Sequence, residues 1–311
     1  MTKDHAIHWL LEAETPSIRY LALRTIVRRN ESDSEVQKAW EDMKKSGPIP
    51  AILRGQTDSG AWANEHSYYT PKYTSTHWRM LLLAELHADP SNVGLQQGAE
   101  YMLMATEDKA QDHAEQGKHS LECFWGNLLR YELHCGNEDD PRLSNVIRIL
   151  AKNGPGAGWR CRYNGERPCA WGAARALWGL AALPEHKRTS EVEAAMQDGL
   201  SFLLDEYSLM DADYPIQEGG KVHALWQRLN FPLFYQADIL FVLRVIAELD
   251  ALDYPGVQPA LEWLRRRRLK NGRWRGANPF RSRTFKELGG RGETDRWISL
   301  FAGMILMSQE D

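Results

Sequence analysis

The sequence is poor in cysteine and lacks a long, uninterrupted apolar run. Four cysteines in 311 residues point to reduced thiols, because a chain this long can bury a large core without disulfides. The longest apolar segment, residues 231–249, contains Gln236, Asp238 and Arg244, so it does not have the pattern of a membrane span. Acidic residues interrupt the short apolar part of residues 1–15, which argues against a signal peptide. We therefore expect a cytoplasmic protein without a membrane span.

An excess of charge of one sign and linker-like segments are also missing. The chain has 38 basic and 42 acidic residues, a net charge of −4, which does not indicate binding to nucleic acid or to an anionic membrane surface. No Ser/Gly-rich run, long charge block or low-complexity tract divides the chain. The sequence therefore predicts one domain over residues 1–311. Helices in residues 1–50 would complete or flank a set of helical-hairpin repeats in residues 51–311.

What the sequence does contain is a recurring helix that is apolar on nearly every face. The stretch 168–183, PCAWGAARALWGLAAL, is the clearest copy, and a helix of this kind must be buried on all sides. Trp78, Trp125 and Trp171 recur at intervals of 47 and 46 residues, which indicates a repeated unit. The predicted buried helices are 72–87, 120–135, 168–183, 231–250 and 293–308, and residues 16–29 would supply a sixth.

Amphipathic helices with a single apolar stripe separate the buried ones. They are predicted at 94–105, 142–151, 190–205 and 256–268. Two concentric rings would satisfy this alternation, with the amphipathic helices on the outside. An open solenoid is the alternative, although its inner helices rarely need to be so apolar. We therefore expect an all-α fold, a single α/α toroid of alternating inner and outer helices.

A glycine turn followed by a tryptophan precedes several of the buried helices. Gln56 with Gly-Ala-Trp at 60–62 precedes the first, and weaker copies end at Trp159 and Trp274. Glycine lets the chain reverse, and the tryptophan can pack over the end of the adjacent hairpin. The motif resembles the QW repeat of squalene-hopene cyclases and related terpenoid cyclases. Their superfamily includes the protein prenyltransferase β subunits, which share the α/α toroid.

Two further stretches, 69–73 (YTPKY) and 231–238 (FPLFYQAD), are similar to compact bacterial prenyltransferase-like or squalene-cyclase-like proteins. The resemblance implies an enzyme of the cyclase, isomerase or lyase type, with an apolar, isoprenoid-like substrate in a central aromatic cavity. Neither ionisation motif of the known enzymes is present. The nearest stretch to DxDD is 211–214 (DADY), and the nearest to DDxxD is 139–143 (DDPRL).

Two other functions remain open at this point. (α/α)6 barrels also host glycan hydrolases and lyases, which use paired carboxylates and aromatic sugar platforms, and a toroid can serve as a non-catalytic binding scaffold. The interior distinguishes these functions. Facing carboxylates ~5–10 Å apart across an open cleft would favour glycan chemistry. A deep aromatic pocket would favour an isoprenoid-like substrate, and a filled interior would favour the scaffold.

Polar and aromatic side chains crowd near the starts of the predicted buried helices, which line one mouth of the cavity in a toroid. An aromatic wall with a few polar groups is the usual form of a small-molecule site and can stabilise a carbocation. The alternative is that the aromatic residues fill the core. The candidate substrate-binding residues are Tyr68, Tyr69, Lys72, His77, Trp78, Trp125, Trp171, Arg175, Phe234, Gln236 and Trp297.

The candidate catalytic residues are Asp238, Cys169, Cys123 and Tyr235. Cys123 and Cys169 occupy equivalent positions, each two residues before a tryptophan, and we expect both to lie within about 10 Å of Asp238. A buried Asp238 is either a general acid with a raised pKa or one half of an ion pair with an arginine. The thiols could act as acid and base groups of a lyase or isomerase, with Cys161 and Cys169 near Asp238, or could simply pack.

The resemblance also implies a zinc ion, because protein prenyltransferases hold zinc with one Asp, one Cys and one His. The candidate ligands here are Cys123, Cys169, Asp238 and His77, a mixed set that suits zinc in kind. No CxxC or HExxH spacing supports this site. The expected partner is a small apolar or amphipathic molecule, and Lys72, which follows Tyr68 and Tyr69, could hold its anionic head group.

Overall fold

The computed structural model describes residues 3–117, 121–211, 223–280 and 288–307. Most of these residues are helical, so the predicted all-α class is confirmed. The strands in these ranges are limited to β1 (Arg160–Cys161) and β2 (Arg167–Pro168), which pair antiparallel, and to two isolated bridges. None of the described helices is both long enough and apolar enough to cross a membrane.

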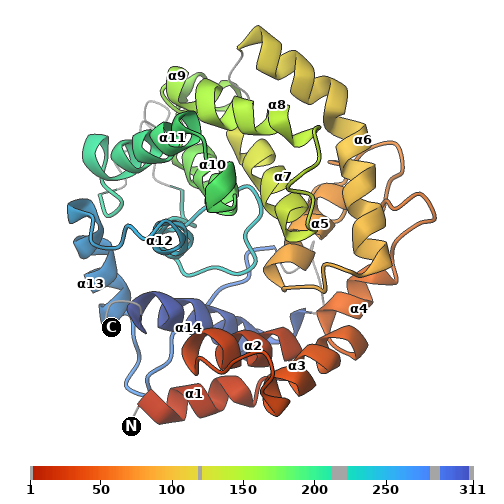
Figure 1. The fold of residues 1–311 in the computed structure, drawn as a ribbon. Helices are drawn as coiled ribbons and strands as arrows, with labels where there is room; N and C mark the ends of the chain where they lie inside the picture. The colour runs from red at the N-terminus through yellow and green to blue at the C-terminus, as the bar shows by residue number, and fades with distance from the viewer. Residues whose placement is uncertain (1–2, 118–120, 212–222, 281–287, 308–311) are drawn as a thin grey trace.

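Each predicted buried helix corresponds to a helix of the structure. These are α5 (Thr76–Glu85), α7 (Glu122–His134), α10 (Ala170–Ala181), α12 (Ile239–Glu248) and α14 (Arg291–Met307), with α2 (Pro16–Leu21) continued by the π-helical turn η1 (Ala22–Ile26). Each packs against the next: α5 on α7, α7 on α10, α10 on α12, α12 on α14, and α14 on α2 and η1. Figure 1 shows these helices arranged around the middle of the molecule.

The other helices form a layer outside them (Figure 1). They are α1 (Lys3–Leu11), α3 (Ser34–Lys45), α4 (Pro48–Leu53), α6 (Val93–Gln116), α8 (Leu143–Arg148), α9 (Gly154–Gly156), α11 (Ser190–Ser201) and α13 (Gln258–Arg266), with the short turns η2 (Ile149–Asn153), η3 (Arg162–Asn164), η4 (Glu185–Lys187), η5 (Phe202–Glu206) and η6 (Pro255–Val257). The four predicted amphipathic helices correspond to α6, α8 with η2, α11 with η5, and η6 with α13. The apolar core lies between the two layers.

The closest helix packing in the described structure joins α7 and α10. A Cβ added to Gly126 would lie 2.1 Å from the carbonyl oxygen of Arg175, and one added to Gly179 would lie 2.5 Å from that of Gly126. Real side chains cannot approach backbone atoms so closely. The two glycines therefore allow the backbones of α7 and α10 to touch, which explains why small residues recur in these apolar helices.

Two of the three predicted glycine–tryptophan turns make equivalent hydrogen bonds, whereas the indole of the third donates to a carboxylate on α11. The indole N–H of Trp62 donates to the carbonyl of Ile52 (2.8 Å), and its backbone N–H donates to the hydroxyl of Thr76 on α5 (3.1 Å). The indole N–H of Trp274 likewise donates to the carbonyl ten residues earlier, that of Leu264 (2.8 Å), and its backbone N–H donates to a serine hydroxyl on α14 (2.9 Å). Each of these two turns therefore ties an outer helix to the next inner helix.

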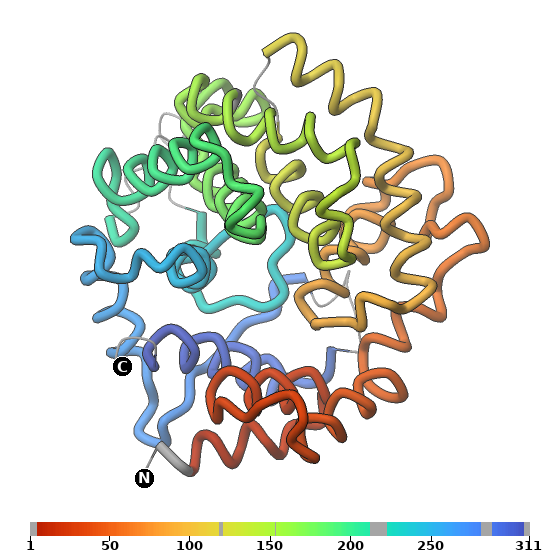
Figure 2. The backbone as a smooth tube through the Cα atoms, in the orientation of Figure 1, coloured from red at the N-terminus to blue at the C-terminus, as the bar shows by residue number. Residues whose placement is uncertain are grey.

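The prediction of a helix over 231–250 is wrong in its first part, because α12 begins only at Ile239. Asp238 has an extended backbone and caps the helix by accepting the N–H of Phe241 at 2.8 Å, which is the usual role of aspartate at this position. The preceding residues 231–237, which we call the crossing segment, run through the middle of the molecule as non-helical chain with several bends (Figure 2). Their peptide groups take partners from neighbouring helices, as in the bond from the Asn127 side chain to the carbonyl of Phe234 (3.0 Å).

Candidate functional site

A lysine and four aromatic side chains form a partly exposed face near the starts of α5, α10 and α12. The ammonium of Lys72 lies 4.9 Å from the ring centroid of Tyr235 and 5.9 Å from that of Tyr69. Trp171 meets Tyr235 edge-on at 6.0 Å, and Tyr68 packs on Phe124 (5.6 Å), whose ring also lies 6.1 Å from that of Tyr69. We call the set Tyr68, Tyr69, Lys72, Trp171 and Tyr235 the aromatic face.

Lys72 provides the positive charge of the aromatic face. Its side chain is exposed, and among the described residues no carboxylate lies within ion-pair distance of its ammonium. The ammonium rests instead over the electron-rich faces of Tyr69 and Tyr235. The predicted site residues Tyr68, Tyr69, Lys72, Trp171 and Tyr235 are therefore brought together, with a cation able to accept an anionic partner.

The other predicted aromatic residues lie in the core. Trp78 is buried behind the face, where its ring centroid is 4.8 Å from that of Tyr69 and its indole N–H donates to the Tyr69 carbonyl (2.9 Å). Phe234, Trp125 and Trp297 are each no more than 1 % exposed. These four side chains fill the interior, and Trp78 gives the rings of Tyr69 and Tyr235 a rigid backing.

Arg175 and Gln236, predicted to bind substrate, hold the crossing segment in place. The Arg175 guanidinium donates twice to the Gln236 carbonyl (3.0 and 2.7 Å) and lies 3.8 Å from the Phe241 ring centroid. Burial is the main reason that the Arg175 pKa is lowered, to about 9. The Gln236 amide donates to the hydroxyl of Tyr73 (3.3 Å). Sequence reasoning missed Tyr73, although it stands in the stretch 69–73 and its ring stacks with Tyr235.

Three thiols lie close to the aromatic face. Cys123 interacts electrostatically with Tyr69 and Tyr235, and also with Cys161 and Cys169. Burial raises the pKa of the Cys123 thiol to about 12, so this thiol stays protonated at neutral pH. Because only the thiolate is a strong nucleophile, the environment of Cys123 does not favour the nucleophilic role that the sequence left open.

The hydrogen bonds of Asp238 do not involve the thiols. One carboxylate oxygen accepts the Phe241 N–H, and the other accepts the backbone N–H and the side-chain amide of Asn230, all at 2.8 Å. Burial raises the Asp238 pKa to about 7, while these three hydrogen bonds and the charge of Arg244 act in the opposite direction. Arg244 itself pairs with Glu85 (3.1 Å). The contacts of Asp238 are those of a helix cap in the framework.

The predicted zinc ligands are not gathered around one point. In residues 3–117, 121–211, 223–280 and 288–307, no three His, Cys, Asp or Glu side chains are placed to hold a metal ion together. His77 shares a hydrogen bond with the hydroxyl of Tyr131 (3.2 Å) and stacks on Phe124 at 4.5 Å, whereas Asp238 bonds to Asn230 and Phe241. This geometry gives the zinc hypothesis no support.

His77 should make the fold sensitive to acid. Burial lowers the pKa of His77 to about 3 from 6.5, so below pH 6.5 the unfolded chain binds a proton that the folded chain refuses. The free energy of unfolding is therefore not reduced by His77 above pH 6.5. As the pH is lowered below 6.5 it decreases, by about 2 kcal/mol at pH 5. Urea unfolding of the wild type and His77→Gln at pH 7 and 5 checks this. Between pH 7 and pH 5 the free energy of unfolding of His77→Gln should fall by about 2 kcal/mol less than that of the wild type. An equal fall in both proteins would refute the buried, neutral state of His77.

A separate cavity of about 360 Å³ lies between the two ends of the described chain. It has the size of a small-molecule site. It is lined by Ala6, Ile7, Leu10, Ile26, Arg265, Arg268, Gly272, Trp274, Ser299, Gly303, Leu306 and Met307. None of these residues was predicted to bind a ligand, and the cavity, which we call the terminal cavity, is a natural control for tests of the aromatic face.

Comparison with known proteins gives no family assignment. No protein-family model matches the chain, and neither does any curated protein or solved structure. The resemblance to terpenoid cyclases therefore stays a prediction, and a proposal of function must start from the aromatic face.

Proposed function

We propose that this chain is a single α/α toroid that binds a small amphipathic molecule, with an isoprenoid-like apolar body and an anionic head group, on the aromatic face. The toroid is supported by the order of helix contacts, from α5 through α7, α10, α12 and α14 to α2. It is also supported by the equivalent hydrogen bonds of the turns at Trp62 and Trp274, which indicate repeated hairpins.

The ligand is inferred from one observation, the exposed Lys72 ammonium held over Tyr69 and Tyr235 without a carboxylate partner among the described residues. A cation of this kind attracts a phosphate or carboxylate group. The rings of the aromatic face, two of them backed by the buried Trp78, offer an apolar surface beside it. Because buried aromatic side chains fill the interior, the proposal is binding at a scaffold surface, and cyclase, isomerase or lyase chemistry on this ligand would be its enzymatic extension.

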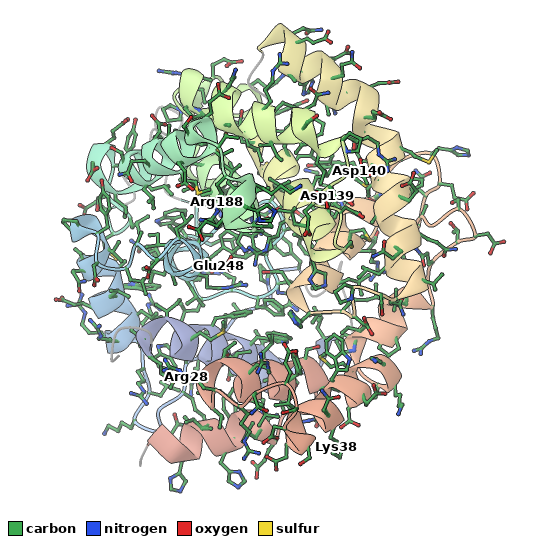
Figure 3. The ribbon with its side chains drawn as sticks, in the orientation of Figure 1. Arg28, Lys38, Asp139, Asp140, Arg188 and Glu248 are labelled. Carbon is green, nitrogen blue, oxygen red and sulfur yellow. The ribbon has the colours of Figure 1, made fainter. Side chains whose placement is uncertain are left out.

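Glycan chemistry is less well supported, because Asp238, Asp139 and Asp140 are engaged in contacts within the fold. Asp238 is buried and caps α12. Asp139 and Asp140, labelled in Figure 3, follow α7, where Asp139 pairs with Lys187 and Asp140 with Arg142. These carboxylates are held in bonds within the fold and do not form a facing pair in an open cleft.

Binding of farnesyl diphosphate, measured by isothermal titration calorimetry, tests the proposal. Lys72→Met should weaken binding of farnesyl diphosphate by about 10- to 100-fold, because a charge-assisted hydrogen bond contributes about 1.5–3 kcal/mol. Farnesol, which lacks the charge, should bind equally to the wild type and to this variant. Trp171→Ala should weaken both ligands, because it removes apolar surface.

Arg268→Gln is the matched control, since it removes a charge at the terminal cavity and leaves the aromatic face intact. It should bind farnesyl diphosphate as the wild type does. The proposal fails if the wild type binds no farnesyl diphosphate, or if Arg268→Gln weakens binding while Lys72→Met does not.

A further inference from the structure

A short β-hairpin brings two cysteines together beside α10. In the β1–β2 register Cys161 lies opposite Arg167, and the N–H of Cys169 extends the ladder by donating to the carbonyl of Trp159 (2.8 Å). Cys161 and Cys169 are therefore diagonal neighbours on the same face of the hairpin. The two thiols interact with each other, and both cysteines are free.

The two sulfur atoms have different surroundings. The Cys161 sulfur accepts a hydrogen bond from Cys169 and from the backbone N–H groups of Tyr163 and Asn164 in the η3 turn. These donors stabilise a thiolate and, against the effect of burial, lower the Cys161 pKa to about 6. Cys169 keeps its proton, because its hydrogen bond to Cys161 and its burial raise its pKa. One nucleophilic thiolate is thus paired with one thiol.

The other two cysteines provide an internal contrast. Burial raises the pKa of Cys123 to about 12 and also raises that of Cys135. Cys161 is itself buried, but Cys169 is partly exposed, and the hairpin turn beside them is open to solvent, with Tyr163 70 % exposed and Arg162 and Glu166 also at the surface. Oxidants and other thiol reagents in solution can therefore approach the hairpin pair from the side of the turn.

From this arrangement we propose that Cys161 and Cys169 form a redox-active pair, which a small disulfide such as oxidised glutathione converts reversibly into an intramolecular disulfide. The Cys161 thiolate attacks one sulfur of oxidised glutathione, forms a mixed disulfide and releases one glutathione thiolate. Cys169 then loses its proton to this thiolate and attacks the Cys161 sulfur, which releases the second glutathione. Two protein thiols are oxidised and one disulfide is reduced to two glutathione molecules.

The start of α10 supports the second step. The Cys169 sulfur accepts the N–H of Gly172 at 3.4 Å in the first turn of the helix, where the helix dipole favours negative charge. A Cys169 thiolate formed during the exchange is therefore stabilised where it must attack. Because diagonal neighbours start ~7–8 Å apart between Cα atoms and a disulfide needs less than about 7 Å, bond formation must draw the two strands closer by about 1–2 Å. Disulfide formation between Cys161 and Cys169 requires no ligand at the aromatic face.

Glutathione redox buffers, followed by alkylation and mass spectrometry, test the pair in the full-length protein. Oxidation should consume two of the four thiols and join the peptides that contain Cys161 and Cys169, and reduced glutathione should reverse it. Cys169→Ser should stop at a glutathione adduct on Cys161, because the resolving thiol is missing. Cys123→Ser and Cys135→Ser are the matched controls and should oxidise as the wild type does.

Three results would overturn the proposal. One is a wild type that keeps all four thiols in an oxidising glutathione buffer. Another is a disulfide that joins Cys123 to either member of the pair. The third is a Cys161→Ser variant in which Cys169 reacts with oxidised glutathione as fast as Cys161 does in the wild type, because the nucleophile would then be misassigned.

Discussion

Replacing Gly126 by alanine should lower the free energy of unfolding by about 3 kcal/mol or more, which is at the upper end for an overpacked site. The new Cβ would lie 2.1 Å from the carbonyl oxygen of Arg175 and 2.5 Å from its carbonyl carbon. A rotamer change cannot relieve a clash between two backbones, so α7 and α10 would have to separate. Urea unfolding followed by circular dichroism measures the effect.

Gly292→Ala is the matched control, because it adds the same methyl group to a helix. Gly292 lies in the first turn of α14, and outside its own helical turn no atom of the described residues lies within 4 Å of the added Cβ. Alanine should be neutral there or should stabilise the fold by up to about 1 kcal/mol, from its higher helix propensity. If Gly126→Ala were as mild as Gly292→Ala, the close contact of α7 and α10 would be wrong.

Asp238→Ala should also be strongly destabilising, by about 3–4 kcal/mol. The substitution removes the cap of α12 and leaves the backbone N–H groups of Asn230 and Phe241 buried without their carboxylate acceptor. Loss of a cap costs ~1 kcal/mol, and each buried unsatisfied group costs ~1–3 kcal/mol. Thermal and urea unfolding, together with farnesyl diphosphate titration of the folded variant, separate a framework role from a role in binding.

Asp238→Asn keeps the size of the side chain and one acceptor oxygen, so it should cost less than Asp238→Ala. It should leave ligand binding and any activity at the aromatic face unchanged. A folded Asp238→Asn protein that had lost activity would instead restore the general-acid role that the sequence left open, and the framework assignment would be wrong.

The inner helices could be predicted from sequence because their apolar residues leave no solvent-facing side. The segment 231–237 could not, since an apolar run of this length fits a non-helical buried chain as well as a helix. The role of Asp238, which directly follows this segment, was also ambiguous from the sequence. A cap and a general acid both place a carboxylate beside apolar residues, and only the hydrogen bonds to Asn230 and Phe241 identify the cap.

The aromatic face was predictable only in part. Trp78 and Trp171 occupy equivalent positions in the repeat, yet Trp78 is fully buried and Trp171 is partly exposed. The difference depends on where the crossing segment and Tyr69 lie, which no periodicity encodes. The β-hairpin that pairs Cys161 with Cys169 could not be predicted either, because strands of two residues show no detectable alternation of apolar and polar residues.

Hydrogen–deuterium exchange with and without farnesyl diphosphate tests most directly whether the aromatic face is the binding site. Slower exchange is expected in residues 68–73 and in the peptides that contain Trp171 and Tyr235, with little change elsewhere. Protection of α1 and the end of α14, around the terminal cavity, would contradict this account and move the site there. Unchanged exchange throughout the chain at a saturating ligand concentration would contradict the aromatic face as a binding site altogether.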